Sequence, residues 1–211
     1  NAFRSEFTDF DSVNIFENRF RADEAYAEFV KEMLAVDDSE KRAEELRRIT
    51  GQSFEFKPRR RQDIDMIALV ADAEKSRQIN PALAFYYADN LPVYATSLVH
   101  TQGQNKINNL DLNGIRFCDM PWKLFPSGAL VSGVQATWPD ARGDLGPLYA
   151  LGLDAFNVMP RLRQLREMPD TQFYGLTGTL VMDQQTLVRQ LMWGAFERGE
   201  VISAPMVFET I

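Results

Sequence analysis

The sequence predicts an α/β fold with a parallel sheet flanked by helices, followed by a C-terminal antiparallel strand segment. Apolar runs at residues 64–70 and 91–96 enclose a helical pattern at 72–88, in which Pro81 either breaks the helix and opens a second turn or kinks it. A strand, a helix and a second strand within about thirty residues are typical of a βαβ unit with parallel strands. The C-terminal part contains three strand-like runs, at 175–182, 187–196 and 201–208, joined by short polar turns, which indicates antiparallel pairing.

The N-terminal part carries one alternating and two helical patterns. Apolar and polar residues alternate at 13–20, which predicts a short strand. Apolar residues recur at helical spacing between 22 and 34, which predicts an amphipathic helix. A second helix is expected to begin near Asp37, with Asp37 and Glu40 forming a capping box, and to end at Gly51.

The middle of the chain alternates between polar connections and apolar elements. Residues 101–113 are predicted to form a loop, and 115–118 a short strand. Residues 126–146 are rich in Pro, Gly and polar side chains, which favours a loop with at most short helical pieces. Residues 148–159 predict a largely buried helix in which Asp154 is the only interior charge.

Composition limits the classes of function. The formal net charge is −7, and nucleic-acid-binding proteins normally present a basic surface, so no nucleic-acid partner is expected. Cys118 and His100 are the single cysteine and the single histidine of the chain. An intrachain disulfide and a zinc site of Cys and His ligands are therefore excluded, and no cofactor is predicted. No run of eighteen apolar residues is present.

A search for catalytic groups finds no recognisable constellation. His100 lies at a strand end without a motif around it, and we interpret it as a surface or loop histidine. Cys118 is interpreted as a small buried hydrophobe. Asp63, Asp65 and Asp72 are assigned to strand ends and caps, and the glycines of 175–178 to a tight turn rather than a nucleotide-binding loop. The sequence therefore predicts a protein that is not an enzyme.

Polar residues follow each predicted parallel strand. They are Asp72 after the first, Thr96 and Ser97 after the second, and Asp119 after the third. Ligands of open parallel sheets bind outside the carboxyl ends of the strands. If the fold contains a cleft, these four residues are expected to line it.

Two further features are candidates for contact with a partner protein. Arg59, Arg60 and Arg61 form a basic run that is expected to be exposed, either as a solvated loop or as a site for an acidic partner. Trp122 follows Pro121 and is interpreted either as a core or lobe-packing residue or, if exposed, as an interface anchor.

Seven blocks of residues occur in a characteristic order. They are PRRRQDID at 58–65, PALAFYYA at 81–88, LPVYATS at 91–97, LNGIRF at 112–117, DMPW at 119–122, LYALGLDA at 148–155 and GLTGTL at 175–180. In this order the blocks resemble the LppC/LpoA family of lipoproteins. The resemblance is specific from about residue 57 onward and looser before it.

This resemblance implies a C-terminal domain like a type I periplasmic-binding protein, with two α/β lobes and a cleft between them. Family members are outer-membrane lipoproteins of the periplasm with an N-terminal helical-repeat domain. They belong to the peptidoglycan synthesis machinery and activate a class A penicillin-binding protein, promoting cross-linking. The family supplies no catalytic residues to transfer. A solute-binding receptor that uses the inter-lobe cleft is the alternative, and an enzyme such as a peptidoglycan hydrolase is a third reading.

The sequence departs from the full family pattern. The lipidated cysteine, the helical domain and the opening strands of the first lobe are missing, and residues 3–10 read as a helix. We therefore expect a truncated domain: the second lobe at 1–122, then a loop, a helix and C-terminal strands at 123–211 that return between the lobes. Membrane contact would run only through the missing N-terminus. Apolar surface left uncovered predicts a dimeric, domain-swapped or edge-rearranged fragment.

Overall fold

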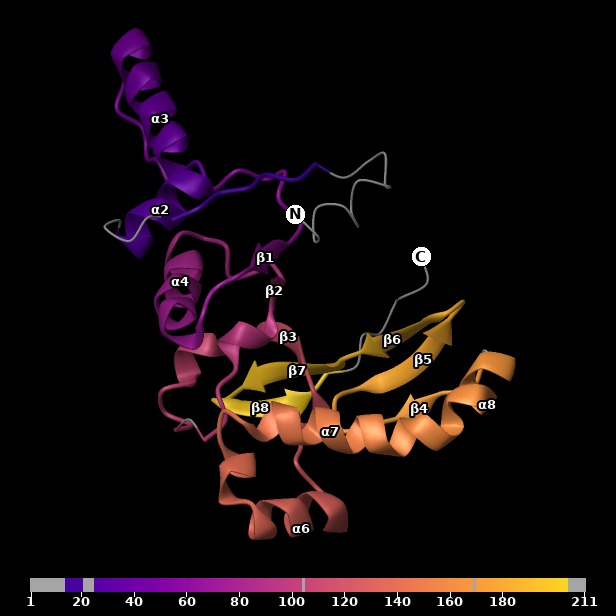
Figure 1. The fold of residues 1–211 in the computed structure, drawn as a ribbon. Coiled ribbons are helices and arrows are strands. Elements are labelled where there is room, and N and C mark those ends of the chain that lie inside the picture. Colours follow the sequence, from indigo (N-terminus) through magenta and orange to yellow (C-terminus); the bar gives the residue numbers. More distant parts are fainter. Residues whose placement is uncertain (1–13, 21–24, 104, 169, 205–211) are drawn as a thin grey trace. The chain divides into compact units, whose positions relative to one another are not determined.

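The computed structural model describes residues 14–20, 25–103, 105–168 and 170–204. The chain divides into two compact units, Asn1–Arg61 and Gln62–Ile211 (Figure 1). This division differs from the expected boundary at residue 122, which falls inside the second unit.

The first unit is built on two helices, α2 (Tyr26–Met33) and α3 (Val36–Thr50). Both confirm the predicted amphipathic helices, and their packed faces share a small core of Val30, Leu34, Val36 and Ala43. Gly51 ends α3 with φ 67° and donates its N–H to the Arg47 carbonyl, as its position in the sequence predicts.

The predicted capping box at the start of α3 is wrong. Ala35 precedes the helix with φ 52°, and no side chain caps it. Asp37 and Glu40 instead bind Lys31 of α2, whose Nζ lies 2.5 and 2.9 Å from their carboxylates. The predicted strand at 13–20 is also wrong over 14–20, which has no regular structure and exposed side chains as far as Arg19. Val13 and the predicted helix at 3–10 lie outside the described residues.

The second unit contains a five-stranded sheet of order β1-β2-β3-β7-β8. The first three strands are parallel, which confirms the predicted βαβ arrangement, and β7 and β8 continue the sheet antiparallel. The strands are β1 (Ile67–Leu69), β2 (Val93–Ala95), β3 (Ile115–Asp119), β7 (Met192–Glu197) and β8 (Glu200–Ser203). Their side chains Ile115, Phe117 and Phe196 are buried, and the Phe117 and Phe196 rings stack with centroids 5.0 Å apart.

Helix α4 (Ala73–Phe85) is the crossover between β1 and β2. Asp72 caps it by accepting from the Lys75 N–H at 2.9 Å, and Pro81 lies inside it, as the sequence predicts. Ser76, Ile79 and Leu83 form its buried face, because they recur at the spacing of one helical side.

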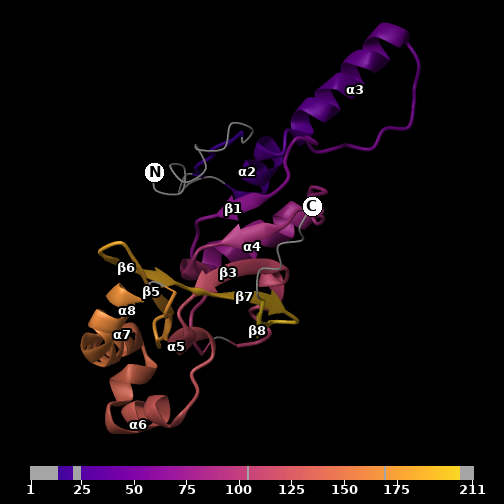
Figure 2. The ribbon, with the colours of Figure 1, turned by 90° about the vertical axis from the view of Figure 1, so that its right-hand side faces the viewer.

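A second, three-stranded sheet has the order β4-β5-β6, from β4 (Phe173–Tyr174), β5 (Thr179–Asp183) and β6 (Thr186–Gln190). The run 187–196, predicted as one strand, is divided at Leu191 between β6 and β7, which belong to different sheets (Figure 2). The three C-terminal strands therefore do not form one antiparallel sheet. The last predicted strand, 201–208, corresponds to β8, which ends at Ser203. Residues 205–208 lie outside the described residues.

The segment between β3 and β4 connects the two sheets through helices. They are α5 (Pro121–Leu124), α6 (Ala129–Thr137), η3 (Pro139–Arg142), α7 (Gly146–Val158), η4 (Met159–Arg161) and α8 (Leu162–Glu167), where η marks a 3-10 turn. Two further 3-10 turns, η1 (Ser97–Val99) and η2 (Leu110–Leu112), lie between β2 and β3. The nine-residue α6 lies in a segment predicted mainly as loop. Helix α7 has the predicted position, but only one side of it is buried, because Leu148 and Phe156 are 63% and 79% exposed.

Candidate functional site

The four predicted cleft residues lie along one edge of the parallel sheet. Asp72 follows β1, Thr96 and Ser97 follow β2, and Asp119 ends β3. Parallel pairing aligns these strand ends, with Leu69 opposite Ala95 and Ala95 opposite Phe117. The topology thus places all four residues at the edge that the sequence predicts.

Some of the polar groups at this edge already form hydrogen bonds and ion pairs within their own unit. Asp72 caps α4 and forms an ion pair with Lys75, and the hydrogen bond from the Lys75 ammonium lowers the pKa of Asp72. Thr96 is exposed and precedes η1, in which Ser97 is half-buried. A nearby pocket of about 350 Å³ is lined by His100, Thr101, Gly103, Lys106, Asn109, Gly199, Glu200 and Val201, and by none of the four.

Asp119 is the most deeply buried carboxylate at this edge, with 2% of its surface exposed. Its Oδ2 lies 2.8 Å from Lys123 Nζ and 3.2 Å from His100 Nδ1, and its Oδ1 accepts from the Met120 N–H at 2.8 Å. Burial alone would raise the pKa of Asp119. The hydrogen bonds from His100, Lys123 and Met120 outweigh burial and hold this pKa below its ordinary value.

His100 is not the surface histidine that the sequence suggested. Its side chain is 9% exposed, and its ring packs 5.2 Å from Phe117 and 6.4 Å from Phe196 between centroids. An ionised carboxylate only accepts hydrogen bonds, so Nδ1 of His100 carries the proton shared with Asp119. The nearby Gln102 amide donates to the Trp122 and Lys123 carbonyls, so this cluster fastens the 100–102 segment to α5.

Cys118, next to Asp119, is half-buried rather than the fully buried small hydrophobe that the sequence suggested. Its burial, together with the negative charge of Asp119, raises its pKa to about 11. A thiol with such a pKa is almost entirely protonated at neutral pH and is a poor nucleophile.

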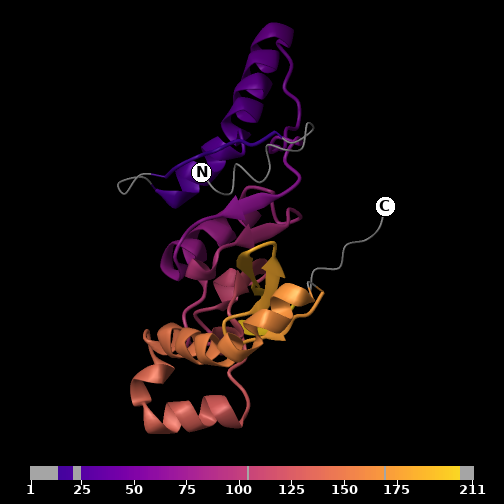
Figure 3. The same cartoon turned by 45° about the vertical axis from the view of Figure 1, so that its right-hand side comes forward.

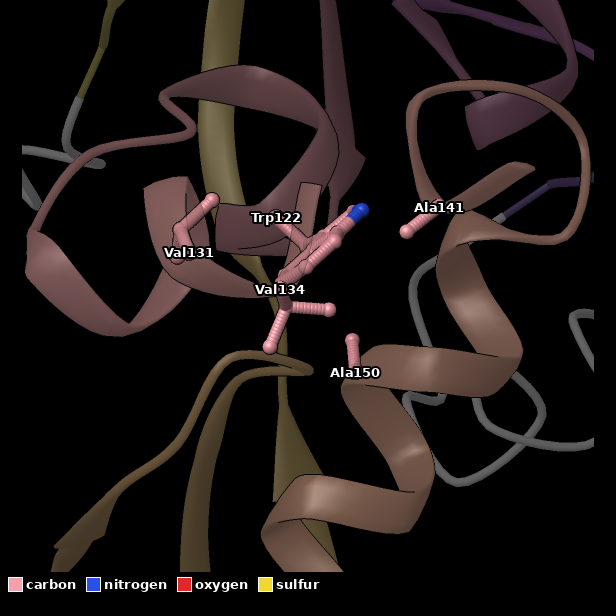
Figure 4. Packing of buried hydrophobic residues seen from close by; sticks show 5 residues of the cluster. All are labelled: Trp122, Val131, Val134, Ala141 and Ala150. Atoms are coloured by element: carbon pink, nitrogen blue, oxygen red, sulfur yellow. The ribbon is translucent and has the colours of Figure 1, made fainter. Parts of the chain in front are cut away.

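Trp122 forms the centre of a core and presents no surface to a partner, since it is 1% exposed (Figure 4). Its indole packs among Val131, Val134, Ala141 and Ala150, which come from α6, η3 and α7. The predicted core role is therefore correct, and the alternative of an exposed anchor is wrong. The core links α6 to α7 through Trp122 and Ala141, and Figure 3 shows α6 at the bottom of the view with α7 above it.

Close packing around Trp122 also explains Gly146 at the start of α7. A Cβ at Gly146 would lie 2.7 Å from Trp122 Nε1 and 2.7 Å from the Ala141 carbonyl oxygen. The backbone N–H of Trp122 donates to the Leu176 carbonyl at 2.9 Å, so the tryptophan is also tied to the 175–178 loop.

Asp154 is a second buried carboxylate, 3% exposed, and it holds the 175–178 loop against α7. It accepts from the backbone N–H groups of Leu176 at 2.8 Å and Thr177 at 2.7 Å, and from the Thr177 hydroxyl at 2.7 Å. A Cβ at Gly175 would lie 2.5 Å from Asp154 Oδ2. The glycine loop is thus a tight turn, closed by the Gly175 N–H on the Gly178 carbonyl, as predicted.

The basic run belongs to the first unit, and its three side chains differ in exposure. Arg59 is exposed, Arg61 is half-buried, and Arg60 is 8% exposed, so the prediction that all three are exposed is wrong for Arg60. The Arg60 guanidinium donates to the Arg61 carbonyl, and the Arg61 guanidinium lies 4.0 Å above the Phe16 ring. The backbone N–H of Arg59 donates to Ser39 Oγ at 3.2 Å, and that of Arg61 donates to the Leu34 carbonyl at 2.9 Å.

Neither a metal-binding cluster nor a membrane-spanning helix is found among the described residues. No group of three or more His, Cys, Asp or Glu side chains in this part of the chain is placed to hold a metal ion. Among the helices that the structure describes, none is both long and apolar enough to cross a bilayer.

Comparison with known proteins connects these structural features to a family. The family described as "LppC putative lipoprotein" matches residues 1–199. The chain belongs to the LppC family. The blocks that carry the family resemblance include Trp122, Asp154 and Gly175, which the structure brings together around α7 and the 175–178 loop.

Relatives of this LppC chain are named penicillin-binding protein activator LpoA. The protein of Photobacterium profundum is 24% identical over 207 residues, covering 96% of this chain and 33% of its own length. That of Vibrio cholerae is 26% identical over 196 residues, covering 91% and 32%. The chain therefore spans about a third of the length of the relatives it matches.

Solved structures show the same fold. The C-domain of Haemophilus influenzae LpoA, titled a regulator of PBP1A, aligns with a TM-score of 0.59 at 19% identity, covering 79% of this chain and 57% of that one. The leucine-binding protein LivK of Thermotoga maritima aligns with a TM-score of 0.51 at 15% identity, covering 96% and 54%. The expected periplasmic-binding-protein-like α/β fold is thereby confirmed, and the chain corresponds to only part of each of these structures.

Proposed function

We propose that this LppC chain is part of a non-enzymatic activator of a class A penicillin-binding protein, which stimulates peptidoglycan cross-linking through protein–protein contact. The observation that carries the proposal is the match to LpoA relatives over more than nine-tenths of the chain. The proposal places the whole protein in the periplasm, anchored in the outer membrane by a lipidated N-terminus, as part of the peptidoglycan synthesis machinery.

The two buried carboxylates support a non-enzymatic role. A catalytic carboxylate needs free hydrogen-bonding capacity toward a substrate. The carboxylate oxygens of Asp119 and Asp154 already accept hydrogen bonds from groups within the fold. Both residues therefore fit a structural role.

Activation requires preferential binding to one state of the synthase. An activator shifts a conformational equilibrium only by its difference in affinity for the two states. The proposed activator binds the cross-linking-competent state more tightly than the resting state. The contact proposed within this chain is the basic run, and Arg59 is the member whose side chain is exposed.

The test measures binding of the chain to purified class A penicillin-binding proteins together with their transpeptidation rate. We expect saturable binding and faster cross-linking. Arg59→Glu is expected to weaken binding roughly tenfold, because charge reversal turns attraction to an acidic partner into repulsion. Arg48→Glu is the matched control, since its side chain is 80% exposed in the same unit. Equal binding by the two variants would exclude the basic run, and no binding by the folded chain would move the contact elsewhere in the longer protein.

A solute-binding receptor is the second candidate, favoured by the position of Asp72, Thr96, Ser97 and Asp119 at one sheet edge. Asp72 and Asp119 already bind side chains of their own unit, which leaves Thr96 and Ser97 as the groups more open to a ligand. A thermal-shift screen of amino acids and peptides discriminates the two functions. A saturable rise in melting temperature that Ser97→Ala abolishes, without any effect on cross-linking, would favour the receptor.

A further inference from the structure

The pocket of about 350 Å³ in the second unit lies between the 100–109 segment and the beginning of β8, and we call it the His100 pocket. Among its lining residues, His100, Lys106 and Glu200 bring an imidazole, an ammonium group and a carboxylate to one space. Its lining side chains are polar apart from Val201. A pocket of this size with several polar groups is suited to a small polar ligand.

His100 contributes a hydrogen-bond acceptor that has no partner. Asp119 accepts the hydrogen bond from Nδ1, so the lone pair of the neutral ring is on Nε2. Among the described residues, no donor bonds Nε2, although the side chain is only 9% exposed. Nε2 is not fully enclosed, in contrast to Trp122 Nε1, so a ligand can reach it. An acceptor that has lost most of its water without gaining a partner favours a ligand that brings a donor.

Lys106 and Glu200 supply opposite charges to the same pocket. Their ammonium and carboxylate lie 2.8 Å apart, and their side chains are 56% and 65% exposed. An exposed ion pair of this kind contributes little to stability, so it can be opened at small cost. A ligand that carries both charges can therefore take the place of each partner.

The walls of the His100 pocket are held in place by contacts within the second unit. The Gly199 N–H donates to Asn113 Oδ1 at 2.9 Å, and a Cβ at Gly199 would collide with the Lys106 carbonyl oxygen. The β7–β8 turn thus packs directly against the backbone of residue 106. On the other side, Arg77 of α4 donates to the Asn108 carbonyl at 2.8 Å. A preformed pocket loses less conformational freedom when a ligand binds.

The three polar groups together restrict the chemistry of the ligand. The Nε2 lone pair and the Glu200 carboxylate both accept hydrogen bonds, which matches an ammonium group, whereas Lys106 donates, which matches a carboxylate. A simple anion would meet the Nε2 lone pair and the charge of Glu200, and a simple cation would meet the charge of Lys106. Only a molecule with both charges satisfies all three groups.

We propose that the His100 pocket binds a small zwitterion of the amino-acid class, with its ammonium group on His100 and Glu200 and its carboxylate on Lys106. The site differs from the candidate sheet edge, because none of Asp72, Thr96, Ser97 and Asp119 lines the pocket. The inference does not rest on synthase activation, since its test measures ligand binding alone.

The first experiment uses His100 as its own reporter, because it is the single histidine of the chain. Its ring signals are followed by NMR while the untagged chain is titrated with L-alanine. We expect a saturable shift with a dissociation constant on the order of 1 mM, because the ligand has few atoms. Propionate and ethylamine each carry one of the two charges of alanine and should bind at least about tenfold more weakly.

Variants of Glu200 and His100 test the two acceptors, with the backbone amide signals of Thr101 and Gly199 as reporters. Glu200→Gln is expected to weaken alanine binding on the order of tenfold. Glu167→Gln on α8 is the matched control, because Glu167 also forms an exposed ion pair and its side chain is 61% exposed. His100→Asn keeps a donor for Asp119 but has no acceptor at the Nε2 position, whereas His100→Gln reaches that position. His100→Gln should therefore bind alanine more tightly than His100→Asn, while thermal unfolding checks that both variants fold.

Three results would overturn the proposal. The first is the absence of a saturable shift of the His100 ring with L-alanine, and the second is equal binding of propionate or ethylamine. The third is binding that Ser97→Ala abolishes and Glu200→Gln leaves unchanged, which would place the ligand at the sheet edge instead.

Discussion

The regions around Asp119 and Asp154 each bury a carboxylate almost completely, but they compensate its charge differently. Asp119 is surrounded by two basic side chains, His100 and Lys123, and one backbone N–H. Asp154 has two backbone N–H groups and one hydroxyl, with no cation among its partners. The first region depends on the ionisation of side chains, whereas the second depends on the backbone conformation of the 175–178 loop.

The largest expected effect is at Asp154. Asp154→Ala leaves the Leu176 and Thr177 N–H groups and the Thr177 hydroxyl without their acceptor in a buried site. We expect a loss of about 3–5 kcal/mol in the free energy of unfolding. Urea denaturation of Asp154→Ala measures it. Asp144→Ala, at an exposed aspartate nearby, should change stability by less than about 0.5 kcal/mol. Similar losses for the two variants would show that Asp154 does not hold the 175–178 loop in place.

A smaller effect, which depends on pH, is expected at Asp119. Asp119→Asn removes the negative charge that faces Lys123 and weakens the hydrogen bonds from Lys123 and His100, so it should cost about 1.5–3 kcal/mol at pH 7. Because folding lowers the pKa of Asp119, its stabilisation is complete above the unfolded value of about 4 and is lost as pH falls through the folded value. Urea denaturation at several pH values should therefore show wild type and Asp119→Asn converging below about pH 4, and a constant difference would contradict this.

Two glycines near Asp154 sharpen the comparison. Gly175→Ala places a Cβ against the Asp154 carboxylate and should destabilise the protein by about 1–3 kcal/mol. Gly152→Ala points into open space on α7 and should stabilise the protein by about 0.5–1 kcal/mol. Thermal unfolding measures both. If both substitutions changed the stability in the same direction, close packing against Asp154 would not be the cause of the effect at Gly175.

The smallest effect concerns Cys118. Its pKa of about 11 implies a thiolate fraction at pH 8 roughly 100-fold below that of an ordinary cysteine, so alkylation should be slowed by about that factor. Burial is the larger cause of the raised pKa, and the charge of Asp119 the smaller. Asp119→Asn should therefore accelerate alkylation only a few-fold, as followed by mass spectrometry. Alkylation as fast as that of free cysteine would show that the thiol is not protected.

The predictions from sequence succeeded where neighbours in the chain decide the structure. The Asp72 cap, the helix through Pro81 and the turn at Gly51 depend on groups within a few residues, and all three are present. The order of the parallel strands follows from apolar runs separated by a helical pattern, and it is also present. The capping box at Asp37 failed because Lys31, on a different helix, competes for both carboxylates.

The candidate site was predictable only in part. Parallel strand order places Asp72, Thr96, Ser97 and Asp119 at one edge, and this could be deduced from the sequence. Whether Asp119 faces a ligand or an internal partner depends on His100, nineteen residues away, and no local pattern encodes that contact. Asp154 stood out as the only charge inside an apolar helix, but its partners lie more than twenty residues further along the chain.

By itself the sequence determined the α/β class, the parallel order of the first three strands and membership of the LppC family, because local periodicity and ordered motifs are properties of the chain. The tertiary structure alone decided that residues 187–196 serve two different sheets, that Trp122 is a core residue, and that one side of α7 stays uncovered. The physical reason is that burial and strand pairing depend on which distant segments meet, and a linear pattern of apolar residues does not specify its partner.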